Sequence, residues 1–278
     1  MSKPRPRIGL ALGGGGARGL AHIPMLEVFD ELGLKPSVIA GSSMGALVGA
    51  AYASGMSGKD LRKHAETLLF DRMTFARHVF GHRKVSPAAL LSLKGFASLH
   101  LSGETLADVA LPDTLPANIE DTHIPLKIIT TDYENRAESV LTHGPLLRAI
   151  GASIAIPGVI AAPLIDGRIH VDGGVVNPVP FDHVRDGVDL VVAIDVTARP
   201  RALQGGRAGN LDVAIGSMLI MFNRIAELKR ALNPPDIYIQ PEIENVGTAD
   251  FFKVKEIFKQ AESAQDRLRK ALRVETEI

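Results

Sequence analysis

Short runs of consecutive apolar residues recur along the chain and are separated by stretches with helical spacing. Five of these runs predict buried strands, at residues 7–12, 37–40, 125–131, 189–196 and 236–240. Helical patterns follow several of them, at about residues 20–32, 46–52, 211–232 and 251–274. Buried strands that alternate with helices are typical of a parallel sheet with helices on both faces. We therefore predict a three-layer α/β/α fold with a mostly parallel central sheet.

A glycine-rich loop follows the first predicted strand. Residues 13–16 are four consecutive glycines, and with Gly19 they satisfy the dinucleotide-binding spacing Gly-x-Gly-x-x-Gly. That interpretation needs an acid at the end of the second strand to bind a ribose, but this strand ends in residues 40–43, Ala-Gly-Ser-Ser. The alternative is an oxyanion hole, because successive glycines expose their backbone N–H groups. Arg18 either adds positive charge there or holds the loop through a salt bridge.

The second predicted strand runs directly into Gly41-Ser42-Ser43-Met44-Gly45, and a helix of small residues follows. Strand, Gly-x-Ser-x-Gly and helix together are the context of a nucleophile elbow. The two glycines allow a sharp turn, which presents the Ser43 hydroxyl at a helix N-terminus, where negative charge is favoured. An ordinary Gly/Ser loop has the same short motif, so this prediction depends on what else the chain offers.

Asp172 ends another short β-like run and precedes Gly173 and Gly174. Asp-Gly on its own also predicts a tight hairpin turn of type I′. An acid followed by two glycines can nevertheless project into a cleft at close quarters. Together with the glycine loop and the Ser43 elbow, it completes a site suited to acyl transfer.

In this order, the blocks resemble the patatin-like phospholipase family, and most of all its short bacterial members. Residues 14–19 resemble the family's oxyanion block, 41–45 its nucleophile block, and 172–174 its Asp-Gly-Gly/Ala block. Residues 152–157, Ala-Ser-Ile-Ala-Ile-Pro, resemble a fourth block. The resemblance covers about residues 7–198 well and the remainder loosely. It implies one patatin-like domain over residues 1–278, with the nucleophile elbow after the second strand.

The resemblance also implies a catalytic Ser–Asp dyad with no histidine between its members. Asp172 would accept the Ser43 proton as Ser43 attacks an ester carbonyl. The expected oxyanion donors are the backbone N–H groups of Gly14, Gly15, Gly16 and Met44. We expect supporting roles for five further residues: Arg18, Gly41, Gly45, Gly173 and Gly174.

Nine histidines are available for a triad instead of a dyad. A triad in the hydrolase order Ser, Asp, His needs a histidine after the acid, and His183 is the one that qualifies. His170 precedes Asp172 by two residues and would share its face of a strand. We expect structural roles for all nine.

Composition narrows the classes of function. A chain of 278 residues suffices for one large α/β domain, and its formal net charge of zero gives no support for nucleic-acid binding. The absence of cysteine excludes disulfides and thiolate metal sites, and no histidine spacing indicates a metal. We expect no cofactor.

The apolar run near the N-terminus stops at Leu12, too short for a signal peptide, and neither residues 36–58 nor 149–165 make a convincing membrane span. We expect a cytoplasmic protein and leave its oligomeric state open.

Residues 57–119 lie between the elbow helix and the third predicted strand, and two interpretations of them remain open. They form ordinary helices that cover the sheet, or a lid or acyl pocket that also contacts membrane lipid peripherally. Residues 199–278 form the helical C-terminal part of the same domain.

The expected activity is hydrolysis of lipid or fatty-acyl esters, of the phospholipase A or lysophospholipase type. The alternatives are a catalytically weak regulatory or scaffold protein on the same fold, and a nucleotide-binding module.

Overall fold

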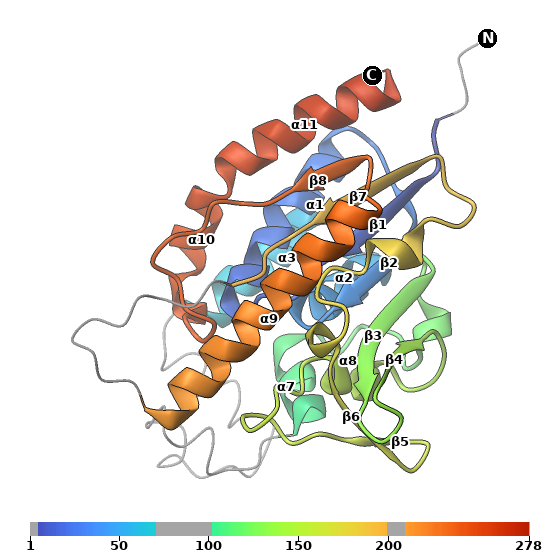
Figure 1. Ribbon diagram of the computed structural model, residues 1–278. Helices are drawn as coiled ribbons and strands as arrows, with labels where there is room; N and C mark the ends of the chain where they lie inside the picture. Colours follow the sequence, from blue (N-terminus) through green and yellow to red (C-terminus); the bar gives the residue numbers. More distant parts are fainter. Residues whose placement is uncertain (1–4, 71–101, 199–208, 278) are drawn as a thin grey trace.

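The computed structural model describes residues 5–70, 102–198 and 209–277, and its centre is a mixed β-sheet (Figure 1). Within these residues the strand order is β5-β6-β3-β2-β1-β7-β8, and β4 pairs with β3 off this path. Strands β3, β2, β1, β7 and β8 run parallel, whereas β4, β6 and β5 add antiparallel pairs. The strand bounds are β1 (Ile8–Leu12), β2 (Pro36–Ser42), β3 (Leu126–Asp132), β4 (Ala137–Leu141), β5 (Leu164–Ile165), β6 (Arg168–Asp172), β7 (Leu190–Ile194) and β8 (Ile237–Ile239).

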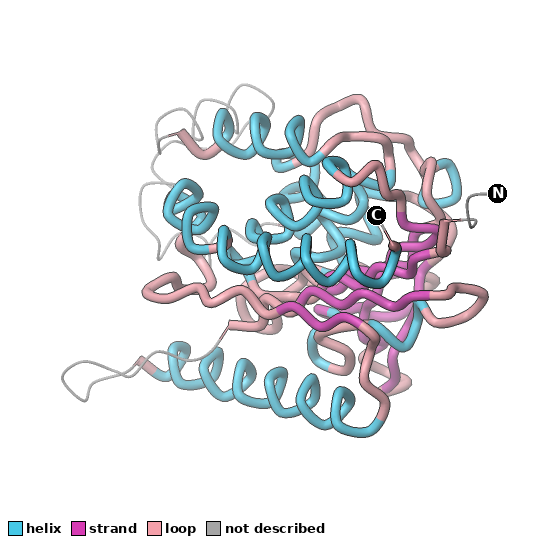
Figure 2. Tube along the Cα trace, turned by 90° about the horizontal axis from the view of Figure 1, so that it is seen from above, coloured by secondary structure: helices cyan, strands magenta, loops and turns pink. Residues whose placement is uncertain are grey.

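Helices lie on both sides of this sheet, most of them on one side (Figure 2). The α-helices are α1 (His22–Glu31), α2 (Met44–Ala53), α3 (Gly58–Leu68), α7 (Gly103–Ala110), α8 (Leu146–Ser153), α9 (Asn210–Leu232), α10 (Val254–Gln260) and α11 (Glu262–Thr276). Short 3-10 helices connect them: η1 (Gly16–Ala21), η2 (Ile119–Asp121), η3 (Gly173–Val175), η4 (Phe181–Val184) and η5 (Phe251–Lys253). The layered arrangement confirms the predicted fold class.

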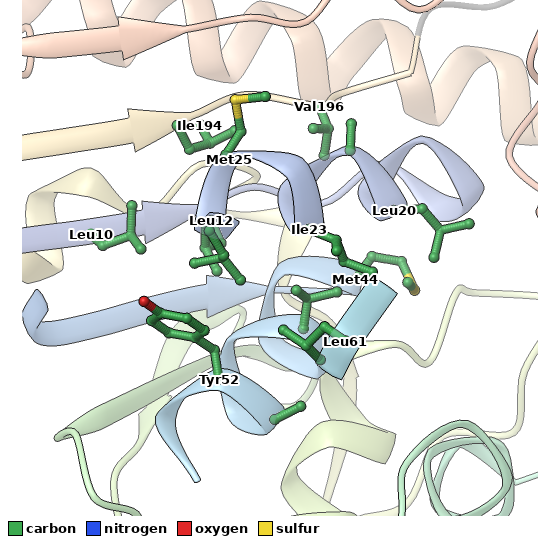
Figure 3. Packing of buried hydrophobic residues seen from close by; sticks show 14 of the residues in the cluster. Leu10, Leu12, Leu20, Ile23, Met25, Met44, Tyr52, Leu61, Ile194 and Val196 are labelled. Atoms are coloured by element: carbon green, nitrogen blue, oxygen red, sulfur yellow. The ribbon is translucent and has the colours of Figure 1, made fainter. Parts of the chain in front are cut away.

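Strand β1 lies in the middle of the sheet, and all five of its residues are buried. Its Leu10 and Leu12 belong to the main hydrophobic cluster, together with Met25 of α1, Tyr52 of α2 and Leu61 of α3 (Figure 3). A strand covered on both faces needs apolar residues at every position, because neither face meets water. The continuous apolar runs of the sequence therefore correspond to the parallel strands.

The register of strand pairing brings two distant parts of the chain together on β3. Along one side of β3, the parallel partner β2 ends with Ser42 opposite Ile129. On the same side, the antiparallel partner β6 also ends here, with its last residue, Asp172, opposite Thr130. Strands β2 and β6 thus meet end to end against one continuous strand, because β4 occupies the other side of β3.

The described parts of residues 57–119 pack as ordinary helices. Helix α3 starts at a capping box, in which Ser57 and Asp60 bond each other's backbone, and its Leu61 and Leu68 are buried. Helix α7 packs against α8. The remainder, residues 71–101, lies outside the described residues, so the lid or acyl pocket stays a prediction.

In the described parts of the chain, no helix combines the length and the apolar character that crossing a bilayer requires.

Candidate active site

Ser43 stands at the sharp turn between β2 and α2. Its backbone angles are φ 54° and ψ −124°, a left-handed conformation that costs a non-glycine residue free energy and is concentrated at functional sites. The turn closes tightly: a Cβ atom on Gly41 would lie 2.6 Å from the backbone N of Ala46, and one on Gly45 would collide with the carbonyl of Leu12. Both flanking glycines are therefore required by the close approach of backbone, as a nucleophile elbow requires.

The Ser43 hydroxyl points at the carboxylate of Asp172. Its Oγ donates to Asp172 Oδ2 at 2.7 Å, and the Gly174 N–H donates to Oδ1 at 2.7 Å. Both side chains are buried, Ser43 to 7% exposure and Asp172 to 1%. This pairing follows from the meeting of β2 and β6 on β3. Asp172 does not begin a hairpin, because the chain continues into η3.

Burial raises the pKa of Asp172 from its ordinary value of 3.8 to about 6. The hydrogen bonds from Ser43 and Gly174 act in the opposite direction, but desolvation of the charged carboxylate is the larger effect. Asp172 is consequently a stronger base than a solvated aspartate, while it still ionises below neutral pH.

Two buried hydroxyls hold the backbone around this pair, and neither was assigned a role from the sequence. Ser153 Oγ accepts from the Ser43 N–H at 2.8 Å and donates to Ile129 O at 2.7 Å. Thr131 Oγ1 donates to Asp172 O at 2.9 Å. The signal for Ser153 was its place in the Ala-Ser block of residues 152–157, which carried the resemblance but no chemistry.

The glycine loop after β1 lies directly beside Ser43. A Cβ atom on Gly14 would be 3.0 Å from Ser43 Cβ, but the Gly14 N–H is already donated to Pro178 O at 2.9 Å. Within the described part of the chain, the N–H groups of Gly15, Gly16 and Met44 form no hydrogen bond. Three of the four expected donors are thus free in this structure.

Packing explains why the loop needs glycines. A side chain at Gly15 would collide with Val196 O, and Gly16 has φ 56° and lies against the backbone of Thr248. His22 Nε2 bonds Gly13 O at 2.7 Å from inside the core, and burial lowers the pKa of His22 to about 4, so the ring is neutral. Arg18 lies just after the loop, in η1.

Neither histidine considered for a triad reaches the dyad. His170 Nδ1 bonds Thr130 Oγ1 at 2.9 Å, and burial lowers the pKa of His170. His183 Nε2 lies 2.9 Å from Glu138 Oε1, and this hydrogen bond raises the pKa of His183. Among the described residues, Ser43 and Asp172 have no histidine partner.

Glu138, Asp182 and His183 place three potential metal-ligand atoms within 4.8 Å of one another. Lys229 Nζ already lies 2.7 Å from Asp182 Oδ1, however, and supplies the positive charge that a metal would bring. These groups form an ion-pair network between β4, η4 and α9.

Several curated proteins match most of this chain. An uncharacterized NTE family protein of Mycobacterium bovis is 37% identical over 205 residues, which are 73% of this chain and 51% of that protein. Patatin-like phospholipase domain-containing protein 7 of Rattus norvegicus is 29% identical over 90% of this chain and 20% of its own length. Lysophospholipase NTE1 of Pyricularia oryzae is 25% identical over 90% of this chain and 17% of its own length. The chain thus spans about half of the mycobacterial relative and a fifth or less of the other two.

Among solved structures, VipD from Legionella pneumophila is similar over 96% of this chain and 68% of that chain, with 15% identity and a TM-score of 0.46. The family model described as patatin-like phospholipase matches residues 10–185, more than half of the chain. That stretch contains the glycine loop, the Ser43 elbow and the Asp172 turn, and the chain accordingly belongs to the patatin-like phospholipase family.

Proposed function

We propose that this protein hydrolyses lipid acyl esters through a Ser43–Asp172 dyad. The observation that carries the proposal is the 2.7 Å hydrogen bond from Ser43 Oγ to Asp172 Oδ2, made by a serine in strained elbow geometry. Membership of a phospholipase family and the lysophospholipase name of one relative support lipid acyl esters as the substrate class.

In the first half of the reaction, Ser43 Oγ attacks the ester carbonyl carbon while its proton passes to Asp172 Oδ2. The negative charge on the carbonyl oxygen is stabilised by the free N–H groups of Gly15, Gly16 and Met44. The ester C–O bond then breaks, and Asp172 returns the proton to the leaving alkoxide. The products of this half are the alcohol and an acyl-serine.

In the second half, water attacks the acyl-serine while Asp172 accepts one of its protons. Collapse of the tetrahedral intermediate releases the fatty acid and restores the Ser43 hydroxyl with that proton. An ester is a suitable target for this site, because a carboxylate with a pKa near 6 is a modest base.

Covalent labelling tests the proposal. A fluorophosphonate probe should label the wild-type protein and not Ser43→Ala, and the labelled residue is identified by peptide mass spectrometry. Hydrolysis of a short-chain p-nitrophenyl ester should be lost in both Ser43→Ala and Asp172→Asn. Labelling at another residue, or an Asp172→Asn variant that keeps most of its rate, would contradict the dyad. A folded wild-type protein without labelling or turnover would favour the scaffold alternative.

A further inference from the structure

Most apolar side chains of helix α9 are half-buried or exposed. Figure 1 shows it crossing in front of the sheet, and Figure 2 shows it on the side opposite to most of the helices. Among the side chains of α9 that the structure describes, only that of Ala226 is buried. A helix of 23 residues normally directs its apolar residues towards its own core, so the apolar residues that stay exposed on α9 need another explanation.

Polar contacts fasten the inner face of α9. Asn223 Nδ2 donates to Ala198 O at 2.7 Å, and Lys229 forms its ion pair with Asp182. The guanidinium of Arg230 lies 4.2 Å from the centre of the Tyr238 ring. Several apolar side chains of the helix are half-buried beside these contacts: Ile215, Met218, Leu219, Phe222 and Ile225.

The opposite face of α9 carries an exposed apolar stripe, with side-chain exposures between 50% and 85%. Spacings of four, seven and eight residues link its members, which therefore share one side of the helix. They span about 30 Å at the rise of an α-helix. The stripe consists of Val213, Ile220, Met221, Leu228 and Leu232. An exposed apolar surface of this length is typical of an interaction site.

The inner face of the same helix reaches the candidate active site. A Cβ atom on Gly174, whose N–H holds Asp172, would lie 2.8 Å from Phe222 Cε2. The turn η3 after Asp172 thus packs against α9. Whatever covers the outer stripe is therefore held one helix diameter away from the catalytic turn.

We propose that the α9 stripe binds the surface of a lipid aggregate and so positions the dyad at its substrate. The inference rests on the proposed function, because the occupant must present acyl esters beside α9. The stripe itself carries no charge, and Arg224 and Glu227 on the same helix form a salt bridge with each other. Apolar insertion, rather than attraction to anionic headgroups, is thus the expected main contribution to binding.

The chain contains no tryptophan, so a single introduced tryptophan reports its own surroundings without background. Met221→Trp should show a blue-shifted, brighter emission when phosphatidylcholine vesicles are added. The matched control is Val274→Trp on α11, a position that is 73% exposed but lies outside the stripe. Its emission should not change. Equal responses at both positions, or none at Met221→Trp, would overturn the proposal.

A triple variant separates lipid binding from chemistry. Ile220→Gln, Met221→Gln and Leu228→Gln together remove the centre of the stripe while keeping good helix formers. Vesicle binding by co-sedimentation, and hydrolysis of lipid in those vesicles, should fall about tenfold or more, whereas hydrolysis of a short soluble ester stays unchanged. Val274→Gln should behave as the wild type in all three assays.

Three other outcomes contradict the docking surface. The triple variant binds vesicles as tightly as the wild type, or the wild type does not bind vesicles at all. Alternatively, sedimentation shows a wild-type dimer that the triple variant loses, in which case a second copy of the chain covers the stripe. If the wild type did not hydrolyse the soluble ester, the proposed function would be refuted instead, because that assay involves no lipid surface.

Discussion

Burial gives Asp172 the basicity that a general base needs near neutral pH. Water is kept from both of its oxygens, and each accepts a hydrogen bond from a fixed donor. The pKa of about 6 follows from this balance of desolvation against hydrogen bonding. In the proposed reaction only the ionised carboxylate can accept the Ser43 proton.

The pH dependence of the reaction follows directly. On a soluble ester, kcat/KM should rise about tenfold per pH unit below pH 6 and level off above it, because it reports ionisation of the free enzyme. The profile should be measured with a neutral ester, whose own charge does not change in this range. A rising limb centred near pH 7 or 8 would instead indicate that a histidine or another group is the base.

Ser153 acts on the backbone of the nucleophile and not on its hydroxyl. Ser153→Ala leaves the buried Ser43 N–H without its acceptor, which should lower the free energy of unfolding by about 1–3 kcal/mol. The elbow should also lose its fixed orientation, lowering kcat on a soluble ester about tenfold to a hundredfold with little change in KM. Urea unfolding measures the change in the free energy of unfolding, and steady-state kinetics measure the changes in kcat and KM.

Ser54→Ala is the matched control for Ser153→Ala. Ser54 Oγ donates to Ala50 O at 2.7 Å at the other end of α2, so the same substitution removes a hydrogen bond far from the nucleophile. The Ser54→Ala variant should be slightly less stable than the wild type, and its kcat should be unchanged. Equal losses of kcat in both variants would show that Ser153 is a general packing residue.

The turn η3 holds two adjacent glycines for different reasons. A Cβ atom on Gly173 would collide with the backbone carbonyl of Ile129, which cannot move without breaking the sheet. On Gly174 the nearest atom belongs to the ring of Phe222, which can rotate, and Asp172 Oδ1 lies 3.0 Å away.

Alanine at these two positions should therefore have unequal effects. Gly173→Ala should fail to fold stably or lose more than about a hundredfold in activity, because it displaces β3 and the dyad together. Gly174→Ala should remain folded and keep activity within about tenfold. Thermal unfolding and soluble-ester hydrolysis of the two variants provide the comparison, and equal damage would contradict the geometry.

The parallel strands were predictable because each contains a run of apolar residues, and the structure places them within a few residues of the predicted bounds. Strands β4 and β5 were not predicted, since β4 is half-exposed and β5 has two residues. The glycines and the serine of the elbow could be found from spacing, because steric demands at a tight turn leave few choices of residue. Ser153 could not, since a buried serine in a helix has no periodic pattern and its acceptor role depends on the register of β3.

At the scale of the whole molecule, the raised pKa of Asp172 makes the stability of the fold depend on pH. A carboxyl whose pKa is higher in the folded than in the unfolded state stabilises the fold at low pH, and this contribution is lost as pH rises from about 4 to 6. Above pH 6 the folded protein carries the cost of a buried charge, which corresponds to up to about 3 kcal/mol.

Asp172→Asn should accordingly be inactive but more stable than the wild type at pH 8, by up to about 3 kcal/mol in the free energy of unfolding. At pH 3 the difference should nearly vanish, because the wild-type carboxyl is then mostly protonated in both states. Urea unfolding at both pH values measures this. A variant that is less stable at pH 8 would mean that the ionised carboxylate stabilises the fold, opposite to the effect of burial.

The end-to-end meeting of β2 and β6 on β3 has a consequence for how such proteins diversify. Ser43 and Asp172 are 129 positions apart, yet their separation is fixed by two neighbouring residues of one strand, Ile129 and Thr130. Segments inserted or exchanged between the two, away from β3, α8 and β6, leave that spacing unchanged. The chain between Ser43 and Asp172 can therefore be lengthened or exchanged during evolution, or by an engineer, while the two side chains stay in register.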